Sequence, residues 1–124
     1  MNAAKTAGLW APVLLYTAFI FWLSSAPRAA PPLFRWYGAD KLIHLGEYAP
    51  LGTLLLRAIS GSRISFRSRF HGAAALAVGV AIGALDELFQ GFVPTRQVSG
   101  WDLLADAAGV LLGLALYRWK ANRS

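Results

Sequence analysis

The chain has 124 residues, of which 56% are hydrophobic and only 15% are charged. This composition excludes an ordinary soluble domain, in which about a quarter of the residues are charged. The absence of cysteine excludes a disulfide framework and thiolate chemistry. A net charge of +6 would suggest nucleic-acid binding in a soluble protein, but the distribution of Lys and Arg indicates a membrane protein and no nucleic-acid partner.

Four segments are long and apolar enough to span a bilayer, which takes about 20 residues each. They run from about residue 8 to 26, 41 to 59, 72 to 93 and 101 to 119, with short loops between them. The sequence therefore predicts one all-α domain over residues 1–124, an integral membrane four-helix bundle. The first segment resembles a signal peptide, but Pro27 directly follows the small residues and disfavours cleavage, so we expect a retained helix.

The basic residues predict the orientation, because Lys and Arg concentrate in cytoplasmic loops. Eight of the twelve lie before the first segment, between the second and third, or at the C-terminal end, counting Arg57 and Arg118 at the edges of their segments. Both termini are therefore expected to be cytoplasmic. Trp22, Trp36 and Trp101 would then lie at the outer interface, and Trp10 and Trp119 at the inner one, as aromatic belts predict.

All six acidic residues fall in the outer halves of the second, third and fourth segments, or at their outer ends. A charge within the hydrocarbon costs at least about 2.5 kcal/mol, so such residues usually face the bundle interior and mark function. At a rise of about 1.5 Å per residue, the polar side chains of the three segments reach similar depths, roughly 5–12 Å below the outer surface. They are His44, Glu47, Tyr48, Asp86, Glu87, Gln90 and Asp106.

Helical periodicity predicts that these polar groups face neighbouring helices. The third and fourth segments each carry one stripe that combines two glycines with polar residues: Gly79, Gly83, Asp86 and Gln90, and Asp102, Asp106, Gly109 and Gly113. Two small residues four positions apart let membrane helices approach closely. The glycine stripes are therefore expected to turn the carboxylates inward.

A purely structural role is the alternative, since polar side chains can link membrane helices by hydrogen bonds worth about 1 kcal/mol each. It is the favoured interpretation for Tyr48 and Gln90 taken singly, and Asp102 could be the N-cap of the last helix. A functional site is favoured for the whole assembly, because buried charge is so costly. That assembly comprises His44, Glu47, Asp86, Glu87 and Asp106.

Two motifs stand out in this region. Residues 40–44 read D-K-L-I-H with Tyr48 four positions on, and residues 86–96 read D-E-L-F-Q-G-F-V-P-T-R with Ser99, Asp102 and Gly109 beyond them. Together they resemble the VanZ-like family, named after a teicoplanin-resistance protein, over about residues 40–113. The resemblance implies a multi-pass protein of the bacterial cytoplasmic (inner) membrane and cell envelope, sometimes linked to glycopeptide resistance. Where the family commonly has Asn, this chain has Asp106, which adds a potential charge.

We predict an outward-facing binding site that takes up or moves a lipid-linked or polar envelope compound, with no cofactor. Lys41 and Arg96 would engage its anionic groups, and the carboxylates would accept hydrogen bonds from sugars or ammonium groups. The expected partners are membrane lipids, a lipid-linked or glycopeptide-related ligand, and further copies of the chain. The predicted binding residues are Lys41, His44, Glu47, Tyr48, Asp86, Glu87, Gln90, Arg96, Ser99, Asp102 and Asp106.

Two geometric expectations follow. His44, a carboxylate of the third segment and one of the fourth should come within about 8 Å, the reach of residues around one pocket. Pro94 ends the third helix, so Arg96 is expected to fold back and pair with one of the buried carboxylates: Asp86, Glu87 or Asp102.

Two other functions stay open. An intramembrane acid–base hydrolase or transferase acting on a lipid-linked substrate would pair His44 with Asp86 or Glu87, with Tyr48 polarising a substrate oxygen. However, no Ser or Cys lies in a recognisable nucleophile motif. A metal site from His44, Glu47, Asp86 and Glu87 would suit Mg, Mn or Fe. One histidine on this side and no cysteine argue against it, so no metal is predicted.

Overall fold

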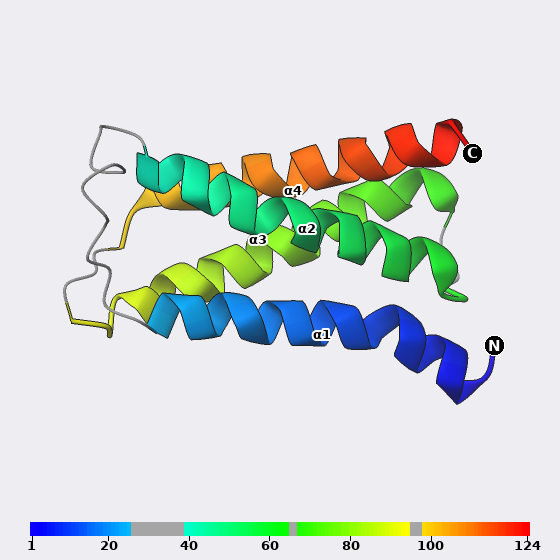
Figure 1. Ribbon diagram of the computed structural model, residues 1–124, viewed down its shortest axis with the longest axis horizontal. Helices are drawn as coiled ribbons and strands as arrows, with labels where there is room; N and C mark the ends of the chain where they lie inside the picture. Colours follow the sequence, from blue (N-terminus) through cyan, green and yellow to red (C-terminus); the bar gives the residue numbers. More distant parts are fainter. Residues whose placement is uncertain (26–38, 65–66, 95–97) are drawn as a thin grey trace.

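The structure is a computed structural model that describes residues 1–25, 39–64, 67–94 and 98–124. The described residues form four α-helices and no strand, so the predicted all-α four-helix bundle is confirmed (Figure 1). The helices are α1 (Ala3–Ser25), α2 (Ala39–Gly61), α3 (His71–Gln90) and α4 (Gly100–Asn122), with a 3₁₀ turn, η2 (Ser68–Phe70), leading into α3. Trp36, Thr95 and Arg96 lie outside the described residues.

The helices run alternately up and down the bundle, so both termini lie at one end (Figure 1). We call this the terminal end. The other end, which we call the polar end, collects the last turns of α1 and α3 and the first turns of α2 and α4. Helix α2 packs against all three other helices, and α1 packs against α2 and α3. The polar segments predicted to share one depth therefore do lie at one end of the bundle.

Glycines bring the backbones of α2 and α4 into contact. A Cβ added at Gly109 would lie 2.5 Å from the carbonyl oxygen of Leu45, and one at Gly113 would lie 2.8 Å from the backbone nitrogen of Thr53. The Thr53 hydroxyl donates a hydrogen bond of 2.9 Å to the Gly113 carbonyl. On α2, Gly52 makes the reciprocal approach to the backbone of α4. Small residues thus permit the close packing that positions the polar groups of these two helices.

The predicted inward stripes of α3 and α4 are confirmed. On both helices the glycines and the polar residues of the stripe are buried. An added Cβ at Gly83 would lie 3.2 Å from the Cβ of Asp106, so this glycine makes room for the α4 carboxylate. Apolar side chains such as Leu51 and Leu55 of α2 form the core beyond the polar residues, toward the terminal end.

Three helical stretches are long and apolar enough to cross a membrane: Ala3–Ser25, Ser68–Gln90 and Gly100–Asn122. Among the described helices α2 is the exception, so the structure supports three of the four expected spans. Helix α2 is as long as α1 and α4, at 23 residues. It is less apolar because its sequence includes Asp40, Lys41, His44, Glu47 and Arg57.

Candidate functional site

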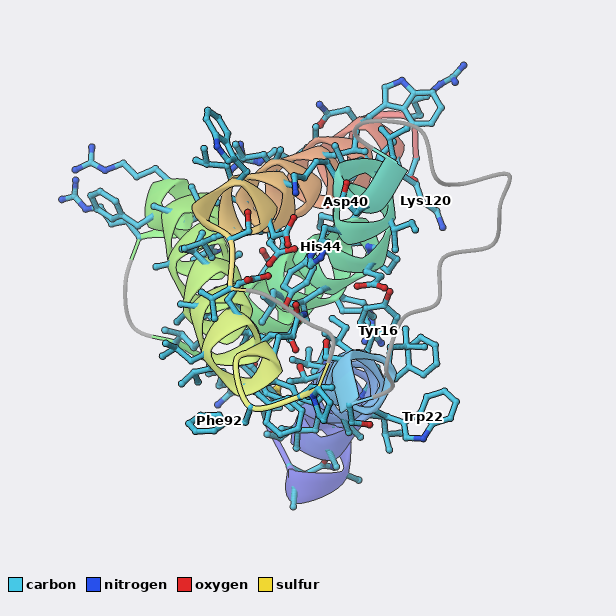
Figure 2. All side chains as sticks on the ribbon, turned by 90° about the vertical axis from the view of Figure 1, so that its left-hand side faces the viewer. Tyr16, Trp22, Asp40, His44, Phe92 and Lys120 are labelled. Atoms are coloured by element: carbon cyan, nitrogen blue, oxygen red, sulfur yellow. The ribbon has the colours of Figure 1, made fainter. Side chains whose placement is uncertain are left out.

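A cluster of buried polar side chains occupies the polar end of the bundle. In Figure 2, which looks along the bundle from this end, His44 points between the helices, whereas Trp22 and Phe92 point outward. The buried polar residues are at most 7% exposed, and they come from all four helices: Ser24, His44, Asp86, Glu87, Gln90, Asp102 and Asp106. The cluster is therefore a set of packed side chains that lies between the helices.

Helices α2 and α4 are joined by charged hydrogen bonds. The Lys41 ammonium donates to Asp40 Oδ2 at 2.6 Å and to Asp102 Oδ1 at 2.5 Å. One turn deeper, His44 Nδ1 lies 2.7 Å from Asp106 Oδ1. The other ring nitrogen, Nε2, lies 3.7 Å from Asp102 Oδ2. The imidazole is thus held between two carboxylates of α4.

The first turn of α4 shows what Asp102 and Ser99 contribute. Ser99, rather than Asp102, is the N-cap residue of α4, and its side chain makes no capping hydrogen bond. The capping alternative for Asp102 was therefore wrong, and its carboxylate instead binds Lys41. Ser99 takes part through its backbone, because its N–H donates to Glu87 Oε2 at 3.1 Å.

A second set of hydrogen bonds centres on Asp86 of α3. The Tyr48 hydroxyl donates to Asp86 Oδ2 at 3.1 Å, and the Gln90 amide donates to the same oxygen at 3.2 Å. Gln90 Nε2 also lies 3.2 Å from Ser24 Oγ, which connects the cluster to α1. Sequence reasoning missed Ser24, because it read this residue only as part of a signal-peptide-like end. Its position in the last turn of α1, at the depth of Gln90, was the available signal.

Three carboxylates of the cluster leave one oxygen each without a hydrogen bond within the described part of the chain. These atoms are Asp86 Oδ1, Glu87 Oε1 and Asp106 Oδ2. The three side chains are 0–3% exposed. A buried polar atom without a partner is costly, so each such atom in a native structure requires an explanation.

His44, Glu87 and Asp106 form the tightest group, which we call the HED group. Each offers one ligand atom, and these atoms all lie within 4.8 Å of one another. The expected approach within about 8 Å is therefore confirmed. Glu47 is not a member of this group; it is half-buried, and its backbone carbonyl accepts a 2.7 Å hydrogen bond from the Tyr16 hydroxyl.

A sequence model described as VanZ/LLP1 matches residues 7–121, which include nearly all of the four helices and both motifs. The chain belongs to the VanZ/LLP1 family. No curated protein and no solved structure gives a match. Family membership, together with three helices long and apolar enough to cross a bilayer, makes this a membrane protein of the VanZ type.

The cluster of this VanZ/LLP1 protein differs from expectation in two pairings. His44 forms its close hydrogen bond with Asp106, not with Asp86 or Glu87. Lys41 was expected to meet an anionic ligand, but its ammonium group already binds two carboxylates. The predicted pairing of Arg96 with a carboxylate lies outside the described residues. The His44–Asp106 and Lys41–Asp102 contacts depend on how side chains of neighbouring helices meet, which periodicity within one helix does not specify.

We expect Tyr48→Phe to destabilise the VanZ/LLP1 bundle by about 1–3 kcal/mol, because the buried Asp86 oxygen loses one of its two donors. The free energy of unfolding can be measured by titrating the detergent-solubilised protein with sodium dodecyl sulfate. Tyr117→Phe is the matched control, because that hydroxyl has no hydrogen bond in the described structure. Equal stability of the two variants would contradict a structural role for the Tyr48–Asp86 hydrogen bond.

Proposed function

We propose that this VanZ/LLP1 protein crosses the bacterial cytoplasmic membrane several times, and that its buried polar cluster binds or moves a polar or lipid-linked compound of the cell envelope. The observation that carries the proposal is the set of three buried carboxylate oxygens without a partner among the described residues. A hydrogen-bond network closed within the described residues would have satisfied them. Polar groups kept in this state within a membrane bundle usually serve a ligand or a transport path.

Charge asymmetry supports an outward-facing polar end. All six acidic residues of the chain lie toward the polar end, with Lys41 beside them. The basic residues at the terminal end are Lys5, Arg57, Arg63, Arg67, Arg69, Arg118, Lys120 and Arg123. By the positive-inside rule, the terminal end faces the cytoplasm and the polar end faces outward. Helix α2 then crosses the membrane with its polar side chains His44 and Tyr48 buried against the other helices, while Leu42 lies on its exposed face.

Orientation can be tested with single cysteines, because the natural chain has none. We expect Arg67→Cys and Ser124→Cys to be protected from an impermeant thiol reagent on intact cells, and Trp36→Cys and Thr95→Cys to be labelled. Labelling after permeabilisation provides the control for accessibility. If position 67 reacts on intact cells and position 95 does not, the orientation is reversed and the polar end faces the cytoplasm.

The chemistry of the cluster favours a ligand that donates hydrogen bonds. Carboxylate oxygens accept from sugar hydroxyls and from ammonium groups, both common in envelope precursors and lipid headgroups. At the rim, the Asp40 side chain is 54% exposed and that of Lys41 37%, so the cluster meets the surface at the start of α2. A headgroup that arrives there would break the Lys41–Asp102 ion pair and form its own contacts with Lys41 and Asp102.

Native mass spectrometry of the detergent-purified protein, combined with lipid analysis, tests this function. We expect one polar or lipid-linked compound to be retained per chain, and the same spectra report whether the chains associate. A protein that retains no such compound, also after incubation with total envelope lipid, would contradict the proposal. Expression in a glycopeptide-susceptible host tests the link to teicoplanin resistance, which we expect to appear as reduced susceptibility.

An intramembrane acid–base hydrolase or transferase is the second candidate, and one observation favours it. The 2.7 Å pairing of His44 with Asp106 is the kind of His–carboxylate contact that orients a general base. Binding or transport and catalysis differ in the compound that the protein releases. A binding or transport protein releases its lipid-linked compound unchanged, whereas an enzyme releases a cleaved or transferred product that mass spectrometry would detect.

A further inference from the structure

The HED group combines one imidazole and two carboxylates, all at most 3% exposed, from three different helices. We propose that His44, Glu87 and Asp106 bind one divalent first-row transition-metal ion, with Zn²⁺ and Mn²⁺ as the best candidates. This inference goes beyond the binding of an envelope compound. It concerns an ion that the protein carries itself, and it does not depend on which compound is bound.

The separations of the possible ligand atoms fit one ion. Nitrogen and oxygen ligands lie about 2.0–2.2 Å from Zn²⁺ in a tetrahedral arrangement, so any two of them are about 3.3–3.6 Å apart. The three atoms of the HED group lie within 4.8 Å of one another. A contraction of at most about 1.5 Å by flexible side chains would therefore complete the coordination.

Free lone pairs provide the second observation. Glu87 Oε1 and Asp106 Oδ2 have no hydrogen-bond donor among the described residues, although both side chains are buried. Two carboxylates balance the charge of one divalent ion. An ion at this position would offset the cost of burying these two oxygens, which have no donor among the described residues.

The surrounding residues are arranged as supports for such ligands. A metal-binding histidine usually donates its second ring N–H to a carboxylate, and His44 Nε2 lies 3.7 Å from Asp102 Oδ2, just beyond hydrogen-bond distance. The ligand atom is then Nδ1, which would exchange its 2.7 Å hydrogen bond with Asp106 Oδ1 for the ion. Asp102 is itself held by Lys41 at 2.5 Å. On the other ligand, the Ser99 N–H holds Glu87 Oε2 at 3.1 Å, which leaves Oε1 for the ion.

The donor set narrows the choice of metal. Mg²⁺ and Ca²⁺ prefer ligand sets of oxygen atoms alone, whereas an imidazole with carboxylates suits Zn²⁺, Mn²⁺ or Fe²⁺. Three protein ligands also leave at least one coordination position for an outside oxygen. If the proposed function holds, a phosphate or carboxylate oxygen of the bound compound is the natural occupant.

The test uses the full-length protein in detergent. The chain is treated with a chelator, incubated separately with Zn²⁺, Mn²⁺ and Co²⁺, desalted, and assayed by elemental mass spectrometry. We expect one ion per chain, and visible absorption bands when Co²⁺ is bound. Glu87→Gln and Asp106→Asn should each weaken binding at least about tenfold, the smallest loss expected even for a group that only supports a ligand. Asp40→Asn, whose side chain is exposed, should bind like the unmodified chain.

Either of two results would overturn the metal site: less than stoichiometric binding of all three ions, or unchanged affinity in both Glu87→Gln and Asp106→Asn. Because these variants could fail to fold, the unmodified chain gives a second readout. Zn²⁺ or Mn²⁺, but not Mg²⁺, should raise its unfolding midpoint, since an ion that binds only the folded state stabilises it. If the chain binds none of the ions but still retains an envelope compound, the metal site is ruled out and the proposed function stands.

Discussion

Replacing Gly113 with alanine is expected to destabilise the bundle by about 3 kcal/mol or more, the upper part of the range for overpacked sites. The new methyl group would meet the backbone carbonyl of Ala49 and lie 2.8 Å from the backbone nitrogen of Thr53. Backbone atoms of a packed helix cannot rotate away as a side chain can, so α2 and α4 would have to separate. Titration of the solubilised protein with sodium dodecyl sulfate, followed by circular dichroism, measures the change.

Gly46→Ala is the matched control on α2. An added Cβ there would have no atom within 4 Å, so the substitution tests helix propensity alone. We expect its stability to rise by about 0.5–1 kcal/mol, because alanine is favoured over glycine inside a helix. If Gly113→Ala is as stable as Gly46→Ala, the close approach of α2 and α4 in this structure is not required for the fold.

Much of this architecture could be predicted from periodicity along single helices. Gly79 and Asp86 are seven residues apart and so lie on one face, and the same holds for Asp106 and Gly113. The sequence therefore indicated which face of each helix is buried, and the shared depth of the polar residues indicated that they would meet. Both expectations rest on helix geometry alone, and for that reason the structure confirms them.

Pairings between helices could not be predicted in the same way. Whether His44 meets Asp106 or Asp86 depends on how far each helix is rotated and shifted along its neighbour. That offset is determined by side-chain packing across the interface, as where Gly83 makes room for Asp106. The same limitation explains why Ser24 was missed, since a serine at the end of an apolar helix has no periodic signal, and its hydrogen bond to Gln90 depends on how α1 packs against α3.

The apolar character of α2 was overestimated for a related reason. Its buried face combines Leu51 and Leu55 with His44 and Tyr48, so the average over the segment hides a polar half and an apolar half. In the bundle the polar half contacts α3 and α4 through hydrogen bonds, while the apolar half joins the core. A helix face that packs against other helices can tolerate polar groups that a lipid-exposed face cannot.

Substitutions in the cluster are expected to separate ligand binding from membrane insertion. His44→Ala, Asp86→Asn and Glu87→Gln should each reduce the retained envelope compound at least about tenfold, because a lost hydrogen bond to a charged group is worth about 1.5–3 kcal/mol. All three should still insert, since removal of a charged or polar group from the hydrocarbon region only eases insertion. Native mass spectrometry measures retention, and membrane fractionation measures insertion.

Asp40→Asn provides the control for this series, because Asp40 is an exposed acidic residue at the same end of the bundle. It changes the charge of the chain by the same amount as Asp86→Asn but leaves the buried carboxylates intact. We therefore expect it to retain the compound at the level of the unmodified chain. If the three cluster variants also retain the compound fully, the buried carboxylates are structural links between helices, and the ligand must be bound elsewhere on the bundle.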